Sequence, residues 1–148
     1  MIEMWFDGAC EPMNPGGHSS YGVVIIEGKE TLLRESGYFC YGKYSSNNVA
    51  EYMGFNRGLS FLIERGRNDQ IIHVMGDSNL VIQQQFGKWK IKKGIYVQHA
   101  LEAKNLMKKF KHISGEWIPR DENSVCDDLS KSILYDRGIR FRIKKYES

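Results

Sequence analysis

The sequence has 148 residues, of which 41% are hydrophobic and 26% are charged, and its formal net charge is +3. This composition excludes a disordered chain, and no apolar run reaches the roughly 18 residues that a membrane span needs. Glu3 near the start argues against a secretory signal peptide, and the three widely spaced cysteines favour a reducing cytoplasm. We therefore expect a cytoplasmic protein.

The chain begins with patterns that are typical of β-strands. Apolar residues alternate with polar or exposed neighbours over residues 2–6, and a turn-rich segment follows at 11–17. Residues 21–26 are β-branched and apolar, as expected of a buried strand, and residues 31–41 can return as a third strand. Two consecutive hairpins are the simplest arrangement of these strands.

Helical spacing replaces the strand pattern from residue 49 to residue 65. Asn48 can cap this helix, and Gly66 can end it. A short apolar strand is predicted at residues 70–75, and a second helix begins near Leu80.

The last third of the chain continues this alternation. A helix is predicted at residues 95–110 and a strand at 113–118, and a last helix begins near residue 123 or 124 and ends near Tyr135. This order of elements excludes a simple helix bundle or β-sandwich. It predicts a mixed sheet with helices on its faces.

Acidic residues occupy four places where a hydrophobic core does not need them. Asp7 interrupts an apolar strand, Glu51 lies near the start of the first helix, and Asp77 follows the fourth strand. Asp127 and Asp128 lie near the start of the last helix. Because strand ends and helix starts can converge on one edge of a sheet, these acids can meet there.

Each acid also has a structural explanation. Glu51 can form a capping arrangement with Asn48, Asp77 can cap the helix that follows it, and Asp127 and Asp128 can favour a helix N-terminus, whereas Asp7 is the hardest of the acids to explain structurally. A convergent carboxylate set would instead suit hard divalent cations. Two such ions about 3.5–4 Å apart can activate a water and stabilise the leaving oxygen of a phosphodiester.

Positive charge is concentrated in two segments. Eight lysines stand against one acid between Phe86 and His112, and five positive residues and no acid lie between Arg137 and Lys145. Such clusters are a plausible footprint for a polyanion such as nucleic acid, although any one lysine can equally belong to a solvated helix face.

Four blocks of the sequence resemble the type 1 ribonuclease H family. The first comprises Asp7–Cys10, Asn14–Gly17 and Tyr21–Gly22, and the others are residues 47–52, 76–81 and 120–129. All four occur in the family's order and at suitable spacing, and together they cover the chain from Asp7 to about Ile133.

This resemblance implies an α/β, ribonuclease H-like fold with a five-stranded mixed sheet in the order 3-2-1-4-5, flanked by helices. It implies one catalytic domain over residues 1–148, with a basic C-terminal tail from about 137 to 148. The implied activity is hydrolysis of the RNA strand of RNA–DNA hybrids, leaving 5′-phosphate and 3′-hydroxyl ends. Two Mg²⁺ ions, or Mn²⁺ as a substitute, would serve as cofactors.

The resemblance also assigns roles by position. The catalytic, metal-binding acids would be Asp7, Glu51, Asp77 and Asp127, with Asp127 preferred to Asp128 because it directly follows Cys126. The substrate-binding residues would be Gly8, Cys10, Asn14, Asn47, Asn48, Asn79, Lys88, Trp89 and Lys90. We expect a monomer that binds the hybrid and no membrane.

The sequence departs from the family pattern in two segments. Many members carry a histidine in the loop before the last acid, whereas residues 118–123 contain none, so Arg120 and Glu122 are the auxiliary candidates there. The family's long basic protrusion is shortened to residues 86–93. The alternatives are a nuclease of the same fold that cleaves double-stranded RNA or junctions, a non-catalytic nucleic-acid-binding module, and an interaction protein whose acids only cap helices.

Overall fold

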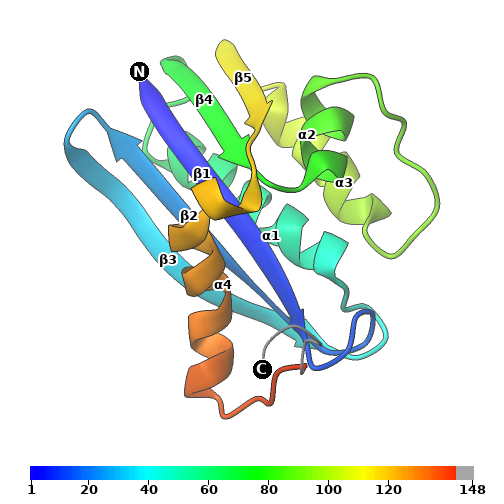
Figure 1. Ribbon diagram of the computed structural model, residues 1–148. Coiled ribbons are helices and arrows are strands. Elements are labelled where there is room, and N and C mark those ends of the chain that lie inside the picture. Colours follow the sequence, from blue (N-terminus) through cyan, green and yellow to red (C-terminus); the bar gives the residue numbers. More distant parts are fainter. Residues whose placement is uncertain (143–148) are drawn as a thin grey trace.

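A five-stranded sheet with helices on both faces forms the framework of the molecule (Figure 1). The computed structural model describes residues 1–142. Strand β2 (His18–Glu27) pairs antiparallel with β1 (Ile2–Glu11) on one side and with β3 (Glu30–Tyr41) on the other. Strands β4 (Ile71–Gly76) and β5 (His112–Trp117) run parallel to β1, which gives the order β3-β2-β1-β4-β5. The predicted topology is confirmed.

The helices divide between the two faces of the sheet. Helix α1 (Asn47–Glu64) packs on β1 and β2, with α2 (Asn79–Phe86) and α3 (Val97–Met107) beside it. A short 3₁₀ turn, η1 (Arg120–Glu122), leads into α4 (Ser124–Asp136), which crosses the opposite face over β1 to β3 (Figure 1). In the described part of the chain, no helix has the length and apolar character needed to cross a membrane.

The hydrophobic core lies between the sheet and α1. Alternate residues at the start of β1 are fully buried, and Phe6 packs edge-on against Phe55 of α1 with 5.4 Å between ring centroids. Along α1, the apolar residues at helical spacing are buried as predicted, including Leu59 and Leu62. Removal of each such side chain from water contributes roughly 1.5–3 kcal/mol to the free energy of folding. This interface therefore holds α1 firmly against β1.

Two predicted helix caps are wrong. The first helix begins at Asn47, and the Ser46 hydroxyl, not Asn48, accepts a hydrogen bond from the Val49 amide at 3.1 Å. The second helix is capped by Ser78, whose hydroxyl accepts from the Val81 amide, and not by Asp77. In both places a serine with extended backbone precedes the helix, which is the usual geometry of an N-cap. Glu51 and Asp77 are therefore not explained as caps.

Other helix and strand limits differ by a few residues from those predicted. Strands β1 and β2 extend to the pair Glu11 and His18, because their antiparallel pairing continues up to the turn. Gly66 ends α1 in a left-handed conformation (φ +68°), as predicted. The third helix is shorter than the predicted 95–110. Of the predicted basic tail at 137–148, the part beyond Arg142 lies outside the described residues.

Candidate active site

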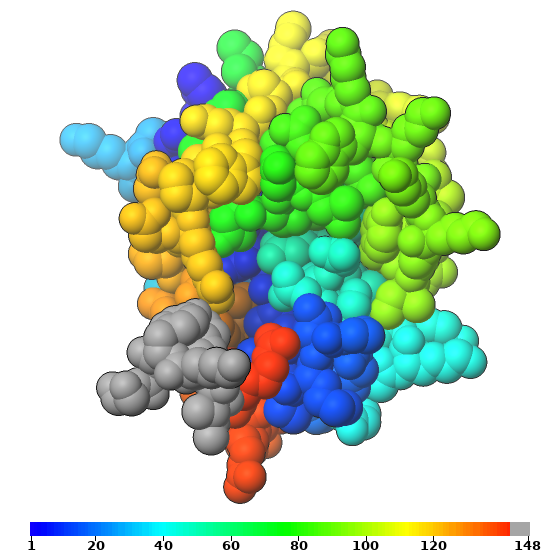
Figure 2. Space-filling model, turned by 45° about the vertical axis from the view of Figure 1, so that its right-hand side comes forward, coloured from blue at the N-terminus to red at the C-terminus, as the bar shows by residue number. Residues whose placement is uncertain are grey.

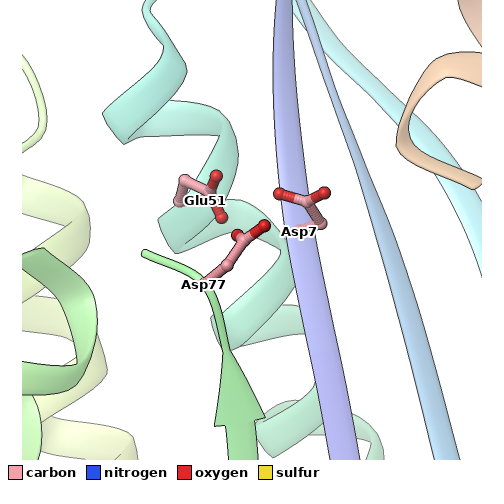
Figure 3. Close-up of side chains that lie close together, drawn as sticks. All are labelled: Asp7, Glu51 and Asp77. Carbon is pink, nitrogen blue, oxygen red and sulfur yellow. The ribbon is translucent and has the colours of Figure 1, made fainter. Parts of the chain in front are cut away.

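Three of the four predicted acids meet at the edge of the sheet where β4 ends (Figure 3). Asp7 lies within β1, Glu51 projects from α1, and Asp77 directly follows β4. Ligand oxygens of the three carboxylates lie within 4.8 Å of one another. We call Asp7, Glu51 and Asp77 the acid triad.

Local packing explains why the acid triad forms. The parallel pairing of β1 with β4 places Phe6 opposite Gly76, so the residues that follow them, Asp7 and Asp77, are neighbours. A side chain at Gly8 would collide with the backbone of α1 at Ala50 and Glu51. Glycine at this position therefore lets α1 approach β1 closely enough for Glu51 to reach Asp7.

The acid triad is electrostatically costly in the absence of cations. Asp7 and Glu51 are each only 4% exposed. Burial, with the nearby charge of Asp77, raises the pKa of Asp7 to about 7. Burial and the proximity of Asp7 raise the pKa of Glu51 well above its ordinary value, and burial also raises the pKa of Asp77. Buried carboxylates that lie close together repel one another when they are ionised, which favours their protonated forms. A bound cation would relieve this repulsion.

The donor set fits a hard divalent cation. The side-chain oxygen Oε2 of Glu51 is buried and has no hydrogen-bond partner among the described residues. An unpartnered buried carboxylate oxygen is unfavourable, and metal coordination is one way to compensate it. Oxygen ligands from carboxylates are those that Mg²⁺ and Mn²⁺ prefer.

Asp127 lies outside the acid triad. Its carboxylate oxygens are 3.8 Å from Nη2 of Arg120 and 3.3 Å from Nζ of Lys131. It is close enough that its negative charge contributes to the raised pKa values of Asp7 and Asp77. Three of the four predicted acids therefore form the cluster, and the fourth, Asp127, lies beside it between the side chains of Arg120 and Lys131.

The acid triad lies in an open hollow of about 530 Å³ (Figure 2). Asparagines form much of its rim, and the side-chain oxygen of Asn14 accepts a hydrogen bond from the Asn47 amide at 2.8 Å, which joins the β1–β2 turn to the start of α1. Of the predicted substrate-binding residues, this hollow is lined by Gly8, Asn14, Asn47, Asn48 and Asn79.

Other predicted site residues lie elsewhere. Cys10 is buried, and its thiol donates to the Met13 carbonyl, so its side chain does not line the hollow. Trp89 and Lys90 line a second hollow of about 580 Å³, which shares Leu80 with the first. Lys88 is exposed and lines neither of these two hollows.

The two auxiliary candidates are separated by the turn of η1. Arg120 lines the hollow of the acid triad, whereas Glu122 lines a separate hollow together with Trp5 and Val125. Successive side chains of a tight turn point in different directions, so a role for Glu122 beside the acid triad is not supported.

Sequence reasoning missed several residues that line the hollow. Trp117 ends β5, and its indole nitrogen donates to the Asp77 carbonyl at 3.2 Å. Its place at the end of a parallel strand was a usable signal, because such ends meet at one edge. No local pattern singles out Glu11, Lys131 or Arg142. The missed residues are Glu11, Ser78, Leu80, Trp117, Lys131 and Arg142.

Sequence comparisons place this site among known proteins. The chain matches the reverse transcriptase-like family over residues 5–133. Ribonuclease HI of Halobacterium salinarum is 30% identical over 135 residues, which are 91% of this chain and 65% of that protein. A bifunctional protein of Mycobacterium tuberculosis is 34% identical over 121 residues, or 82% of this chain. The chain spans about a third, 32%, of the length of this mycobacterial relative.

Solved structures agree with these comparisons. The crystal structure of ribonuclease H1 from Halobacterium salinarum superposes with a TM-score of 0.79 at 26% identity, over 91% of this chain and 98% of that one. LC11-RNase H1, isolated from compost, superposes with a TM-score of 0.81 at 29% identity, over 92% and 96% of the two chains. LC11-RNase H1 has also been solved in complex with an RNA/DNA hybrid.

The sheet order and the carboxylates at its edge define a protein of the ribonuclease H-like class. Among proteins of this class, the sequence resemblance to type 1 ribonuclease H is confirmed by the archaeal relative and by the superposed structures. The chain belongs to the reverse transcriptase-like family, and it is similar in sequence and fold to type 1 ribonucleases H.

Proposed function

We propose that this chain is an endoribonuclease that hydrolyses the RNA strand of RNA–DNA hybrids with the help of two divalent cations. The observation that carries the proposal is the acid triad in an open hollow, with a buried, unpartnered oxygen on Glu51. The hybrid complex of LC11-RNase H1 supports the choice of substrate. The products would carry 5′-phosphate and 3′-hydroxyl ends.

In this proposal the acid triad holds the cations, and Asp127 is a fourth ligand. Bound Mg²⁺, or Mn²⁺ in its place, supplies Lewis acidity for attack of water on a phosphodiester. Arg120, at the rim and 3.8 Å from Asp127, positions that carboxylate and adds positive charge beside the substrate. A non-catalytic binding module would gain nothing from buried carboxylates that face phosphate.

The rim of the hollow suits a hybrid duplex. The amide side chains of Asn14, Asn47, Asn48 and Asn79 line it. Amides both donate and accept hydrogen bonds, so they can bind 2′-hydroxyl groups and base edges in a shallow minor groove. Trp89 and Lys90 in the neighbouring hollow offer an aromatic face and a cation for the adjoining backbone.

A cleavage assay tests the proposal directly. Labelled RNA–DNA hybrid, RNA duplex, DNA duplex and a four-way junction are incubated with the protein and Mg²⁺, with and without EDTA. We expect cleavage of the RNA strand of the hybrid alone, and none in EDTA. Cleavage of RNA duplex or junction instead would favour the same-fold alternatives, and metal-dependent binding without cleavage would favour a binding module.

Arg120→Ala is expected to lower turnover about tenfold, which is at the low end of the effect of losing an auxiliary group while the cations remain. Glu122→Gln, in the same turn but facing another hollow, is the matched control and should retain most of the turnover. Steady-state cleavage of the hybrid measures both. Equal decreases in the two variants would mean that the turn, and not Arg120, matters.

The lysines of the shortened basic protrusion are expected to contribute to affinity by binding phosphates. Lys88, Lys90, Lys92 and Lys93 are replaced with alanine, and the binding constant for the hybrid is measured at several salt concentrations. The plot of its logarithm against the logarithm of the salt concentration should become less steep by roughly 0.7–0.9 for each phosphate that is no longer bound. A triple variant of Lys108, Lys109 and Lys111, which follow α3, is the control. An unchanged slope in the quadruple variant would make the protrusion only a solvated surface.

The expectations of a single catalytic domain, a monomer and a cytoplasmic location stay predictions. Sedimentation of the purified chain with and without hybrid, and fractionation of cells that express it, check the last two.

A further inference from the structure

The chain turns back toward the acid triad after α4. Gly138 adopts a left-handed conformation (φ +72°), and the amides of Gly138 and Ile139 each donate at 3.0 Å, to the carbonyls of Tyr135 and Leu134. These two bonds form the Schellman arrangement, which reverses the chain at the end of a helix. The direction of the segment that follows is therefore set by the end of α4.

Two further contacts hold this segment, residues 137–142, which we call the strap. The rings of Tyr135 and Phe141 stack with 4.3 Å between centroids. The guanidinium of Arg137 lies 3.9 Å from the ring centroid of Tyr38 on β3. The strap, red in Figure 2, consequently lies beside the β1–β2 turn at the rim of the hollow.

Arg142 of the strap forms an ion pair with Glu11. Arg142 donates to Glu11 from Nε to Oε1 at 2.8 Å and from Nη2 to Oε2 at 3.1 Å, and its backbone amide also donates to Oε1. Nη2 donates further to the Cys10 carbonyl at 3.0 Å. The Glu11 side chain is 7% exposed. A buried carboxylate held by two nitrogens of an arginine fork is a strong, geometrically specific contact.

The same arginine also borders the hollow of the acid triad. Arg142 is 46% exposed and lines the hollow together with Asn14 and the acid triad. Among residues 1–142, the structure records no acceptor for its nitrogen Nη1, which carries two donors. Without Arg142, Glu11 would add another negative charge to a rim that must accept phosphate.

We propose that Arg142, held by Glu11, contacts a backbone phosphate of the bound RNA–DNA hybrid away from the scissile bond; this inference rests on the proposed function. Glu11 lies four residues beyond Asp7 on β1, or roughly 13 Å at about 3.3 Å per residue. A contact at that distance strengthens binding of the hybrid and does not touch the reacting atoms. Arg142 is therefore a substrate-binding residue and not a catalytic one.

The first test separates binding from turnover. Arg142→Ala should raise KM for the hybrid about fivefold to tenfold, leave kcat within about twofold, and lower the salt slope of binding by roughly 0.7–0.9. Arg140→Ala removes the same charge from an exposed position of the strap that does not line the hollow, and should change neither KM nor the slope. Identical effects in the two variants would overturn the proposal.

A second variant separates substrate contact from structural damage. Arg142→Ala leaves Glu11 as an unpaired buried charge, whereas Glu11→Gln combined with Arg142→Ala does not. If the arginine binds phosphate, the double variant retains the weakened affinity at normal Tm. Recovery of wild-type affinity in the double variant would show that the buried charge weakened binding, and would overturn the proposal.

A phosphate-by-phosphate scan gives the decisive result. Hybrids with one neutral methylphosphonate at each position are bound to the Asp7→Asn protein in EDTA, with and without Arg142→Ala. A methylphosphonate at one position should weaken binding when Arg142 is present but not in the Arg142→Ala protein. The Arg140→Ala protein should keep the wild-type sensitivity at that position. The comparison is a double-mutant cycle between protein and substrate. If wild-type protein cuts hybrid but no position is coupled, only this inference fails. If it neither binds nor cuts hybrid, the proposed function fails as well.

Discussion

Asp7→Asn is expected to abolish cleavage of the hybrid, to less than a few per cent of wild type, while the protein remains folded. Asp7 supplies one of the three carboxylates of the acid triad, which we propose holds the cations. Asparagine has nearly the same shape, so the packing around it, and the bond that the Gly8 amide makes to Asp7 Oδ1 at 2.8 Å, can persist. Initial rates with Mg²⁺ and circular dichroism measure the two properties separately.

The same substitution should raise the Tm of the metal-free protein, because it removes one of three clustered like charges. Asp128→Asn is the matched control, since Asp128 is exposed beside Asp127 and outside the acid triad. It should leave both activity and Tm close to those of wild type. If the Asp7→Asn protein still cleaves the hybrid, or if the Asp128→Asn protein does not, the roles of these acids have been assigned wrongly.

In EDTA, the free energy of unfolding is expected to increase as the pH falls from about 8 to about 5. The pKa of Asp7 is about 7 in the folded protein and 3.8 ordinarily, and the pKa of Glu51 is raised as well. Between these values the folded state binds more protons than the unfolded state, so lowering the pH favours folding and raising it opposes folding. The change should be on the order of 3 kcal/mol, since one pKa unit corresponds to about 1.4 kcal/mol.

Urea unfolding at several pH values in EDTA measures this dependence. The Asp7→Asn and Glu51→Gln variants should each flatten it. Millimolar Mg²⁺ should stabilise the wild type most at the higher pH, because a cation that binds only the folded state adds stability and binds the ionised carboxylates. A wild-type protein that loses stability steadily from pH 8 to pH 5 would contradict the origin assigned to the raised pKa values.

Local patterns in the sequence were enough to predict the helices and strands and to single out two members of the acid triad, Asp7 and Asp77. The alternation in β1, the apolar spacing of α1 and the return to short strands are local signals, because each element buries one face. Asp7 and Asp77 were recognisable because a carboxylate within or directly after an apolar strand needs an explanation other than packing. The four blocks that resemble type 1 ribonuclease H then supplied the sheet order, which periodicity alone does not specify.

Tertiary structure decided which of these residues share a site. The close approach of α1 to Gly8 brought Glu51 to Asp7, whereas Asp127, on α4, lies next to the triad and beside Arg120 and Lys131. The 3₁₀ turn η1 directed Arg120 toward the acid triad and Glu122 away from it, although the two residues are close neighbours in the chain.

The contact between Glu11 and Arg142 is the clearest example of what local patterns leave undecided. The two residues are separated by 131 positions, and nothing near either one signals the other. Their pairing depends on the reversal at Gly138 and on the aromatic stack that directs the strap. Local periodicity reports which face of an element is buried, but pairings between distant segments depend on how the elements pack, and so only the folded chain shows them.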